Sequence, residues 1–311
     1  MINIVKRRYW YFALSLLIII PGLISLATNG LRLSISFTSG ALLEIQFTDL
    51  QGKTLLLEDA RQAYESRDLG TPLVQVAGND TFTIRSKPID QPTKTAIEKD
   101  LGSKYGKYVE LSFETVGPEV SAEVTRSAAL AVIAASMGLL IYITLAFMRV
   151  DRPWRYGVAA IIAMLHDVAV VTGLASIFGV LFDFEIDALF LTALLTIIGF
   201  SVHDTIVVFD RIRENAARRR GDSFETIVNY SVVQTLDRSI NTQLTVFFTL
   251  LALTLFGGVT IRNFVLTLMI GVLSGTYSSI FNAAQILVAW ETGEVVSYVQ
   301  RLIGRVQPAR N

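Results

Sequence analysis

Two His-Asp pairs are the residues of this sequence best suited to do chemistry. His166-Asp167 and His203-Asp204 both lie within long apolar runs, and they contain the only two histidines of the chain. A carboxylate inside a bilayer-spanning helix costs about 2.5–3.5 kcal/mol on insertion scales, so each aspartate needs a partner or a proton. Histidine titrates near neutral pH and is therefore a candidate proton relay or tuning group. The pairs predict buried groups that exchange protons.

A structural interpretation of the same residues stays open. A buried aspartate can simply hold helices together through hydrogen bonds, and a buried histidine is usually a satisfied hydrogen-bonding residue. Asp204 is the stronger proton-binding candidate, because Ser201 and Thr205 add polar surface to its helix and Arg238 follows in the next apolar region. Neighbours in sequence point about 100° apart around a helix, so the His and Asp of a pair can address different partners.

Two polar stripes follow the aspartates at helical spacing. The first begins at Arg238 and continues with Asn241 or Thr242, Thr245 and Thr249, provided that the helix starts before its apolar run. Arg238 could instead extend to the lipid headgroups. The second stripe comprises Ser274, Ser278, Asn282 and Gln285. Beside it, Gly271 and Gly275 form a GxxxG arrangement, which we interpret as close helix packing.

Several other chemistries are not supported. The chain has no cysteine, which excludes disulfides, thiol catalysis and thiolate metal sites. Neither histidine belongs to an H-E-x-x-H pair, and Gly52-Lys53-Thr54 lacks the first P-loop glycine, because Phe47 stands in its place. The net charge is zero, without a long basic run. We therefore expect no covalent catalytic site, no metal or cofactor, and no nucleic-acid partner.

The composition identifies the elements that must carry these residues. With 52% hydrophobic and 17% charged residues and a mean hydropathy of +0.50, the chain is typical of a membrane protein. A membrane-spanning helix needs about 20 apolar residues. Six runs qualify, and the first is predicted to be an uncleaved signal anchor: 9–31, 128–148, 156–182, 188–209, 240–259 and 263–290.

Lysine and arginine predict the orientation of these six helices, because they are enriched in short cytoplasmic loops. They gather before the first helix, after the second, after the fourth and at the C-terminus: Lys6, Arg7, Arg8; Arg149, Arg152, Arg155; Arg211, Arg213, Arg218, Arg219, Arg220; Arg301, Arg305, Arg310. Both termini are therefore expected in the cytoplasm, with the long loop 32–126 on the outer face.

That long loop is predicted to be a folded domain. Its apolar residues alternate in short segments at 41–47, 73–76, 81–85 and 109–115, and helical patterns occupy 55–66 and 93–105. Gly78-Asn79-Asp80 is typical of a hairpin turn. The order βαββαβ predicts a ferredoxin-like α+β domain. The predicted organisation is 1–31 N-terminus and first helix, 32–126 outer domain, 127–290 five helices, and 291–311 cytoplasmic tail.

The sequence resembles the SecF family, the smaller partners of SecD in the bacterial protein-export accessory complex and a branch of the RND superfamily. The resemblance rests on blocks in a fixed order: "FTSGALLEI" from Phe37, "TVGPEV" from Thr115, "AMLHDVAVVTG" from Ala163, "IIGFSVHDTIVVFDRIREN" from Ile197, "LDRSINTQLT" from Leu236 and "FGGVTIRNFVLTLMIGVLSGTYSSIF" from Phe256. It implies a half-RND unit of six transmembrane helices in the bacterial inner membrane.

The resemblance also implies a function and roles for particular residues. Family members pair with SecD, act beside the SecYEG translocon, and use proton flow to help draw preproteins outward. Asp204 matches the proton-linked aspartate of the family, Arg238 its charged partner, and Asp167 the aspartate of the family's HD block. His203 replaces a common Asn. Segment 34–40 departs from the usual Gly-Ile-Asp-Phe-Thr-Gly-Gly pattern, which puts a special hinge role there in doubt.

Two other functions remain alternatives. A structural or assembly subunit would use the polar membrane residues only to bind its partner. An RND-type exporter of small molecules or lipids would normally need two repeats of helices, whereas this chain has one six-helix unit.

Overall fold

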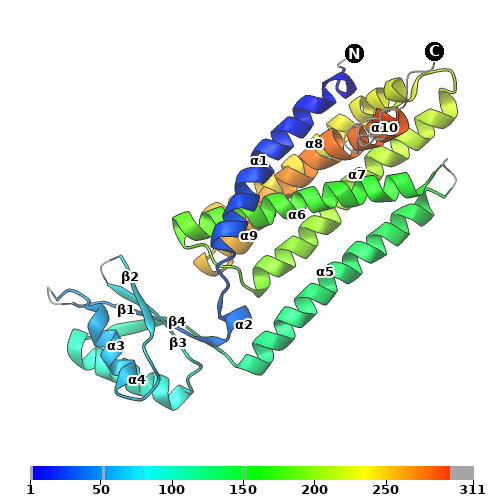
Figure 1. The fold of residues 1–311 in the computed structure, drawn as a ribbon. Helices are drawn as coiled ribbons and strands as arrows, with labels where there is room; N and C mark the ends of the chain where they lie inside the picture. Colours follow the sequence, from blue (N-terminus) through cyan, green and yellow to red (C-terminus); the bar gives the residue numbers. More distant parts are fainter. Residues whose placement is uncertain (1–2, 51–52, 79, 149, 151, 295–311) are drawn as a thin grey trace, which may run out of the picture. The chain divides into compact units, whose positions relative to one another are not determined.

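The computed structural model describes residues 3–50, 53–78, 80–148, 150 and 152–294. The chain divides into two compact units, one formed by the residues up to Arg32 and from Leu130 onward, and the other by Leu33–Ala129. We call them the helical unit and the α+β unit (Figure 1). Residues 52, 79 and 149, and the predicted tail beyond residue 294 with its arginines, lie outside the described residues.

The protein is a polytopic α-helical membrane protein. Among the described residues, six helices are long and apolar enough to cross a membrane. The first span, Val5–Asn29, contains a short 3₁₀ turn and α1. The others are α5 (Pro118–Ala146), α6 (Trp154–Phe182), α7 (Ala188–Arg218), α8 (Phe224–Phe256) and Ile261–Glu291.

Two helices extend well beyond their predicted apolar runs. The fourth span ends at Arg218 rather than near residue 209, and the fifth begins at Phe224 rather than near residue 240. Ser223 caps α8 by accepting a hydrogen bond from the backbone N–H of Thr226. Hydropathy locates only the apolar part of a helix, whereas capping residues fix its end. The early start places Arg238 and the residues after it within α8.

The last span is interrupted by a π-helical segment, which the apolar run did not predict. This last helical region consists of α9 (Val259–Ser278), the π-helical segment η2 (Ser279–Ala283) and α10 (Ala284–Glu291). A π turn contains one more residue than an α turn and often occurs at functional sites. Here it leaves the neighbours Ser278 and Ser279 both fully buried. The last helix therefore presents two successive hydroxyls to the interior.

Helix α1 (Arg8–Asn29) packs closely against α6 at two glycines, and the two helices lie side by side in Figure 1. A Cβ atom added to Gly22 would lie 2.8 Å from the Cα of Gly173. Close to these glycines, the Oγ atom of Ser176 on α6 lies 2.9 Å from the Oγ atom of Ser25 on α1. The same hydroxyl donates a 2.7 Å hydrogen bond to the carbonyl of Gly30. Small residues thus permit a direct backbone contact.

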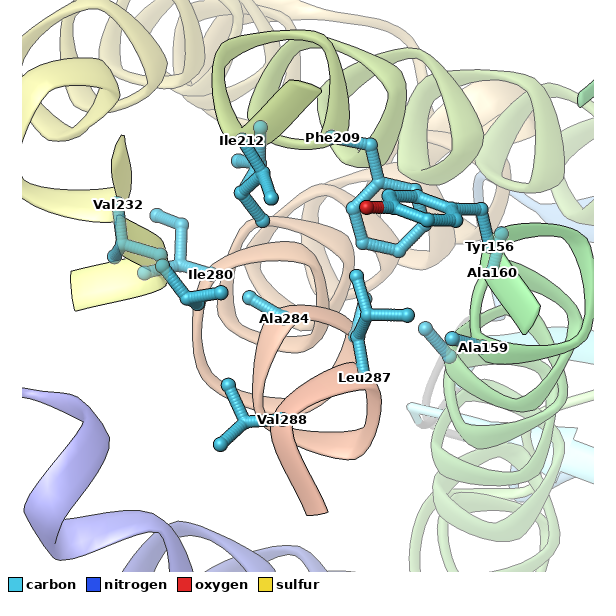
Figure 2. Packing of buried hydrophobic residues seen from close by; sticks show 14 of the residues in the cluster. Tyr156, Ala159, Ala160, Phe209, Ile212, Val232, Ile280, Ala284, Leu287 and Val288 are labelled. Atoms are coloured by element: carbon cyan, nitrogen blue, oxygen red, sulfur yellow. The ribbon is translucent and has the colours of Figure 1, made fainter. Parts of the chain in front are cut away.

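An apolar cluster joins α6, α7, α8 and α10. It lies at the end of the helical unit where Ile4 and Val5 are buried. Figure 2 shows Leu287 and Val288 of α10 among side chains from the other three helices. The rings of Tyr156 and Phe209 meet edge to face with centroids 5.2 Å apart. This packing provides a rigid frame for the polar residues described below.

The α+β unit contains one antiparallel sheet and two main helices. Its strands are β1 (Gly40–Phe47), β2 (Leu73–Ala77), β3 (Thr81–Ser86) and β4 (Tyr108–Val116), in the spatial order β2-β3-β1-β4. The helices α3 (Leu57–Glu65) and α4 (Gln91–Tyr105) give the chain order βαββαβ that the sequence predicts. Their apolar residues pack with alternate residues of β1, including Leu43, Ile45 and Phe47.

The segment that departs from the family pattern forms a short helix, α2 (Ile35–Thr38), which was not predicted. Ser34 caps it by accepting from the N–H of Ser36. Ser39 follows with φ 63° and ψ 152°, a backbone conformation that favours glycine. Its hydroxyl donates a 2.9 Å hydrogen bond to the carbonyl of Val116. The hydroxyl of Ser39 therefore stabilises a strained backbone conformation with a hydrogen bond that glycine cannot make.

Acid should weaken the contact between α3 and α4. Burial raises the pKa of Asp59, but ion pairing with Lys104 at 2.5 Å and a hydrogen bond from Tyr105 outweigh it, so the pKa lies below its usual value. A carboxyl with a lowered folded pKa contributes stability above its unfolded pKa of about 3.9 and loses it as the pH falls through the folded value. In the full chain, amide exchange in α3 and α4 should accelerate below about pH 4.

Asp59→Asn should remove this part of the pH dependence and leave faster exchange at neutral pH. Glu58→Gln is the matched control, because Glu58 is exposed and pairs with Arg61 at the surface at 3.6 Å. An unchanged acid response in Asp59→Asn would show that another carboxyl is responsible.

Candidate functional site

Asp167 is the centre of a buried polar site in the helical unit. It lies on α6 with 1% of its surface exposed. Three hydroxyls donate to its carboxylate: Ser201 of α7 at 2.5 Å, Ser278 at 2.6 Å and Ser274 of α9 at 2.7 Å. The Nδ1 atom of His166 lies 3.0 Å from the same carboxylate. Four hydrogen-bonding groups from three helices thus meet at one carboxyl group, so Asp167 joins α6, α7 and α9.

His166 extends this site to α1. Its Nε2 atom lies 3.1 Å from the Oγ of Ser15, whose hydroxyl also meets the amide of Asn282, with Nδ2 at 2.9 Å and Oδ1 at 3.2 Å. The ring of Tyr277 stacks on the imidazole with centroids 6.1 Å apart. Contrary to what helix geometry alone suggests, this His does contact the Asp that follows it. A continuous row of hydrogen bonds thus runs from α1 to Asp167.

The π-helical segment binds α7 next to this centre. Ser279 donates a 3.0 Å hydrogen bond to the carbonyl of Ser201, and Thr205 Oγ1 lies 3.0 Å from Ser279 Oγ. A Cβ atom added to Gly275 would lie 3.2 Å from the Cβ of Ser201. Gly271 is approached still more closely by Ile197 of α7. Both glycines of the GxxxG arrangement therefore face α7, as close packing requires.

Asp204 lies almost one turn beyond Ser201 on α7 and is 4% exposed. Gln243 of α8 donates a 2.6 Å hydrogen bond from Nε2 to the Oδ2 atom of Asp204. Among the described residues, Asp204 takes part in this one side-chain hydrogen bond and in no ion pair. His203, the residue before it, is exposed on the surface of the helical unit and makes no hydrogen bond to Asp204 among the described residues.

Arg238 does not contact Asp204 in the described part of the chain. It is exposed and lines a cavity of about 350 Å³ between α5, α7 and α8. Other charged residues of the cavity pair along α7, with Arg211 on Glu214 at 2.7 Å and Arg213 on Asp210 at 2.5 Å. Arg238 thus influences Asp204 through space rather than through a direct bond.

The predicted stripe Asn241, Thr242 and Thr245 faces away from the site. All three are exposed, and Thr242 and Thr245 donate to carbonyls one turn back in their own helix, each at 2.9 Å. The buried face of α8 instead carries Ser239 and Gln243. Of the second predicted stripe, Ser274, Ser278 and Asn282 belong to the site, whereas Gln285 is buried without a hydrogen-bond partner among the described residues.

Sequence reasoning missed Gln243 and Ser15. Gln243 belongs to the quoted block LDRSINTQLT, and its four-residue spacing from Ser239 was the available signal. Ser15 gave none, because it is a lone hydroxyl in an apolar run.

The fold and the buried carboxylates define a multi-span membrane protein whose helices meet at buried polar residues. The family described as "Protein export membrane protein SecD/SecF, C-terminal" matches residues 96–293. The chain belongs to the SecD/SecF family of protein-export membrane proteins.

Individual members give more detail. The chain is 51% identical to the protein translocase subunit SecF of Thermobaculum terrenum, over 99% of this chain and 98% of the relative. It is also 51% identical to SecF of Anaerolinea thermophila, over 97% and 98% of the two chains. The crystal structure of SecDF from Thermus thermophilus superposes with a TM-score of 0.78 at 32% identity, covering 94% of this chain and 39% of that one. The chain thus spans about two fifths of that SecDF protein.

Proposed function

We propose that the chain is the SecF subunit of a SecD–SecF complex, which uses the proton motive force to promote preprotein movement through the SecYEG translocon in a bacterial inner membrane. The relatives named as translocase subunits support the export role, and the SecDF protein of similar fold supports SecD as the partner. The proposal includes cytoplasmic termini and a ferredoxin-like domain on the outer face, at 32–126. The helices form half of an RND-type unit that SecD completes.

The observation that carries a proton role is the unequal pairing of two buried carboxylates. Asp167 is surrounded by four hydrogen-bond donors, whereas Asp204 has one, from Gln243. A carboxylate with few donors in an apolar environment is the easier one to neutralise by a proton. Asp204 therefore exchanges the proton, and Asp167 with His166 fixes α6 against its neighbours and relays charge toward α1.

The coupling to export follows from the helix contacts. Protonation of Asp204 removes a buried charge that Arg238 and Gln243 both favour, so the preferred packing of α7 against α8 changes. Arg238 lies in the cavity beside this contact, whereas Asn241, Thr242 and Thr245 lie on the exposed face of α8 and point away from Asp204. His203 tunes the charge at Asp204 from the same helix. The domain at 32–126 follows the movement through the first and second spans.

Asp204→Asn should abolish the stimulation of export by a proton gradient while the complex still assembles. The experiment uses membrane vesicles that contain the chain with its SecD partner, and compares export with and without the gradient. Asp210→Asn is the matched control, because Asp210 is exposed on the same helix and, among the described residues, pairs with Arg213 at 2.5 Å. Undiminished stimulation in Asp204→Asn would remove Asp204 from the mechanism.

A structural or assembly subunit is the second candidate, and the fully bonded state of Asp167 favours it. In that case Asp204→Asn and Arg238→Met would weaken binding to SecD in a pull-down and leave proton flux unchanged. The third alternative, an RND-type exporter of small molecules or lipids, predicts uptake of such a solute by the reconstituted complex. The pull-down and the flux assay, measured together, separate these functions.

A further inference from the structure

Gln243 connects Asp204 to α8 through one end of its amide. The side chain is 8% exposed, and its Nε2 atom donates the 2.6 Å hydrogen bond to Asp204. The other end, Oε1, is buried and has no hydrogen-bond partner among the described residues. Only the Nε2 side of this buried amide therefore makes a hydrogen bond among the described residues.

A second unused polar atom lies on the same face of α8. Ser239 Oγ is also buried without a partner in the described part of the chain. Ser239 and Gln243 are four residues apart, so their side chains are neighbours on the helix surface. An unpaired buried polar atom costs free energy, and two of them beside one carboxylate need a physical reason.

Proton uptake by Asp204 supplies that reason. An ionised carboxylate only accepts hydrogen bonds, whereas a carboxylic acid carries one O–H that must find an acceptor. The Oε1 atom of Gln243 becomes that acceptor when the amide turns by half a revolution about its last bond. The same rotation moves Nε2 to the side that Oε1 occupied. The idle oxygen is then used.

We infer that Gln243 is a positioning residue whose amide turns over when Asp204 gains a proton. The inference rests on the proposed proton role of Asp204. An amide can partner both charge states, whereas an arginine or lysine suits only the ionised one and an apolar residue suits neither. The proton thus reverses a hydrogen bond between α7 and α8 without breaking their contact.

The other charged groups around Asp204 cannot perform this exchange. His203 on α7 and Arg238 on α8 are exposed and make no hydrogen bond to Asp204 in the described part of the chain. The carboxylate of Asp167 on α6 contacts α7 through Ser201. The hydroxyl of Ser201 already donates its hydrogen bond to Asp167. Among the described residues, Gln243 is therefore the group that can follow a proton at Asp204.

The test is infrared difference spectroscopy of the full chain with its SecD partner, reconstituted in vesicles and titrated with pH. In the unsubstituted protein, protonation should produce a carboxylic C=O band, and this band should be absent in Asp204→Asn. A side-chain amide band should change at the same pH, and this change should be absent in Gln243→Met. In Gln243→Met the carboxylic band should move to a higher frequency, because its O–H loses the acceptor. Ser239→Ala, on the same face of α8, should keep both the carboxylic band and the amide change.

Gradient-driven export should fall about tenfold in Gln243→Met, the ratio expected from losing one hydrogen bond to a charged group. Leu244→Met is the matched control, since Leu244 is the next residue and is exposed. A carboxylic band that is identical in the unsubstituted protein and in Gln243→Met would overturn the inference and leave the proton role intact. Absence of any band that depends on Asp204 would instead overturn the proposed function itself.

Discussion

Replacing Asp167 by alanine should destabilise the helical unit by about 2–5 kcal/mol, the range for breaking several buried hydrogen bonds of a charged group. The substitution leaves the hydroxyls of Ser201, Ser274 and Ser278 and the Nδ1 atom of His166 without their common acceptor. Serine hydroxyls can turn back to carbonyls of their own helix, as Ser278 already does toward Gly275 at 3.2 Å, which limits the loss.

The free energy of unfolding of the purified full chain, measured in mild detergent by a reversible denaturant titration, checks this expectation. Asp167→Asn should lose less than Asp167→Ala, because the amide keeps one acceptor oxygen but directs an NH₂ group at hydroxyls that were donors. Asp237→Ala is the control, since Asp237 is exposed on α8. Equal stability of Asp167→Ala and the unsubstituted chain would mean that the four donors contribute nothing to holding the helices together.

Replacing Gly22 by valine should separate α1 from α6. Even the first carbon of a side chain would lie 2.8 Å from the backbone of Gly173, and backbone cannot move aside as a side chain can. Overpacking of this kind costs about 1–3 kcal/mol. The displacement also pulls Ser15 away from His166, whose hydrogen bond is 3.1 Å long, and Ser25 away from Ser176.

Crosslinking between cysteines introduced at exposed positions of α1 and α6 should therefore lose yield in Gly22→Val, along with a fall in the free energy of unfolding. Gly199→Ala is the matched control, because no atom lies within 4 Å of the position where its Cβ would stand. It should be neutral or slightly stabilising, since alanine favours a helix over glycine by about 1 kcal/mol. Normal crosslinking in Gly22→Val would show that α1 tolerates a wider separation.

The membrane helices and the order of the α+β unit were accessible from sequence, because long apolar runs and alternating segments are direct consequences of the surrounding solvent. Helix ends were less accessible. The start of α8 depends on Ser223 as a cap and on polar residues that hydropathy scores as loop. The π-helical segment of the last span left no pattern, because Ser279–Ala283 mixes polar and apolar residues in the same way as the α-helix around it.

The sequence predicted both aspartates of the site and the partners of Asp167, but missed Gln243, the partner of Asp204. A carboxylate in an apolar run is conspicuous, so Asp167 and Asp204 stood out. Periodicity shows which residues share a face of a helix, but it does not say which face is buried. The stripe with Thr242 and Thr245 was chosen for its polar residues, yet the interior receives Gln243 on another side of α8. Only tertiary packing decides between such faces.

The extra residue of the π turn lies between the polar half and the apolar half of the last span. Because a π turn contains one more residue than an α turn, deleting one residue between Ser279 and Ala283 would give an ordinary α turn and leave α10 nearly in its present phase. Leu287 and Val288 would then stay in the apolar cluster of Figure 2. The same deletion in the regular helix would rotate the residues after it by about 100°, so the π turn is the place where this span should best tolerate the loss of a residue.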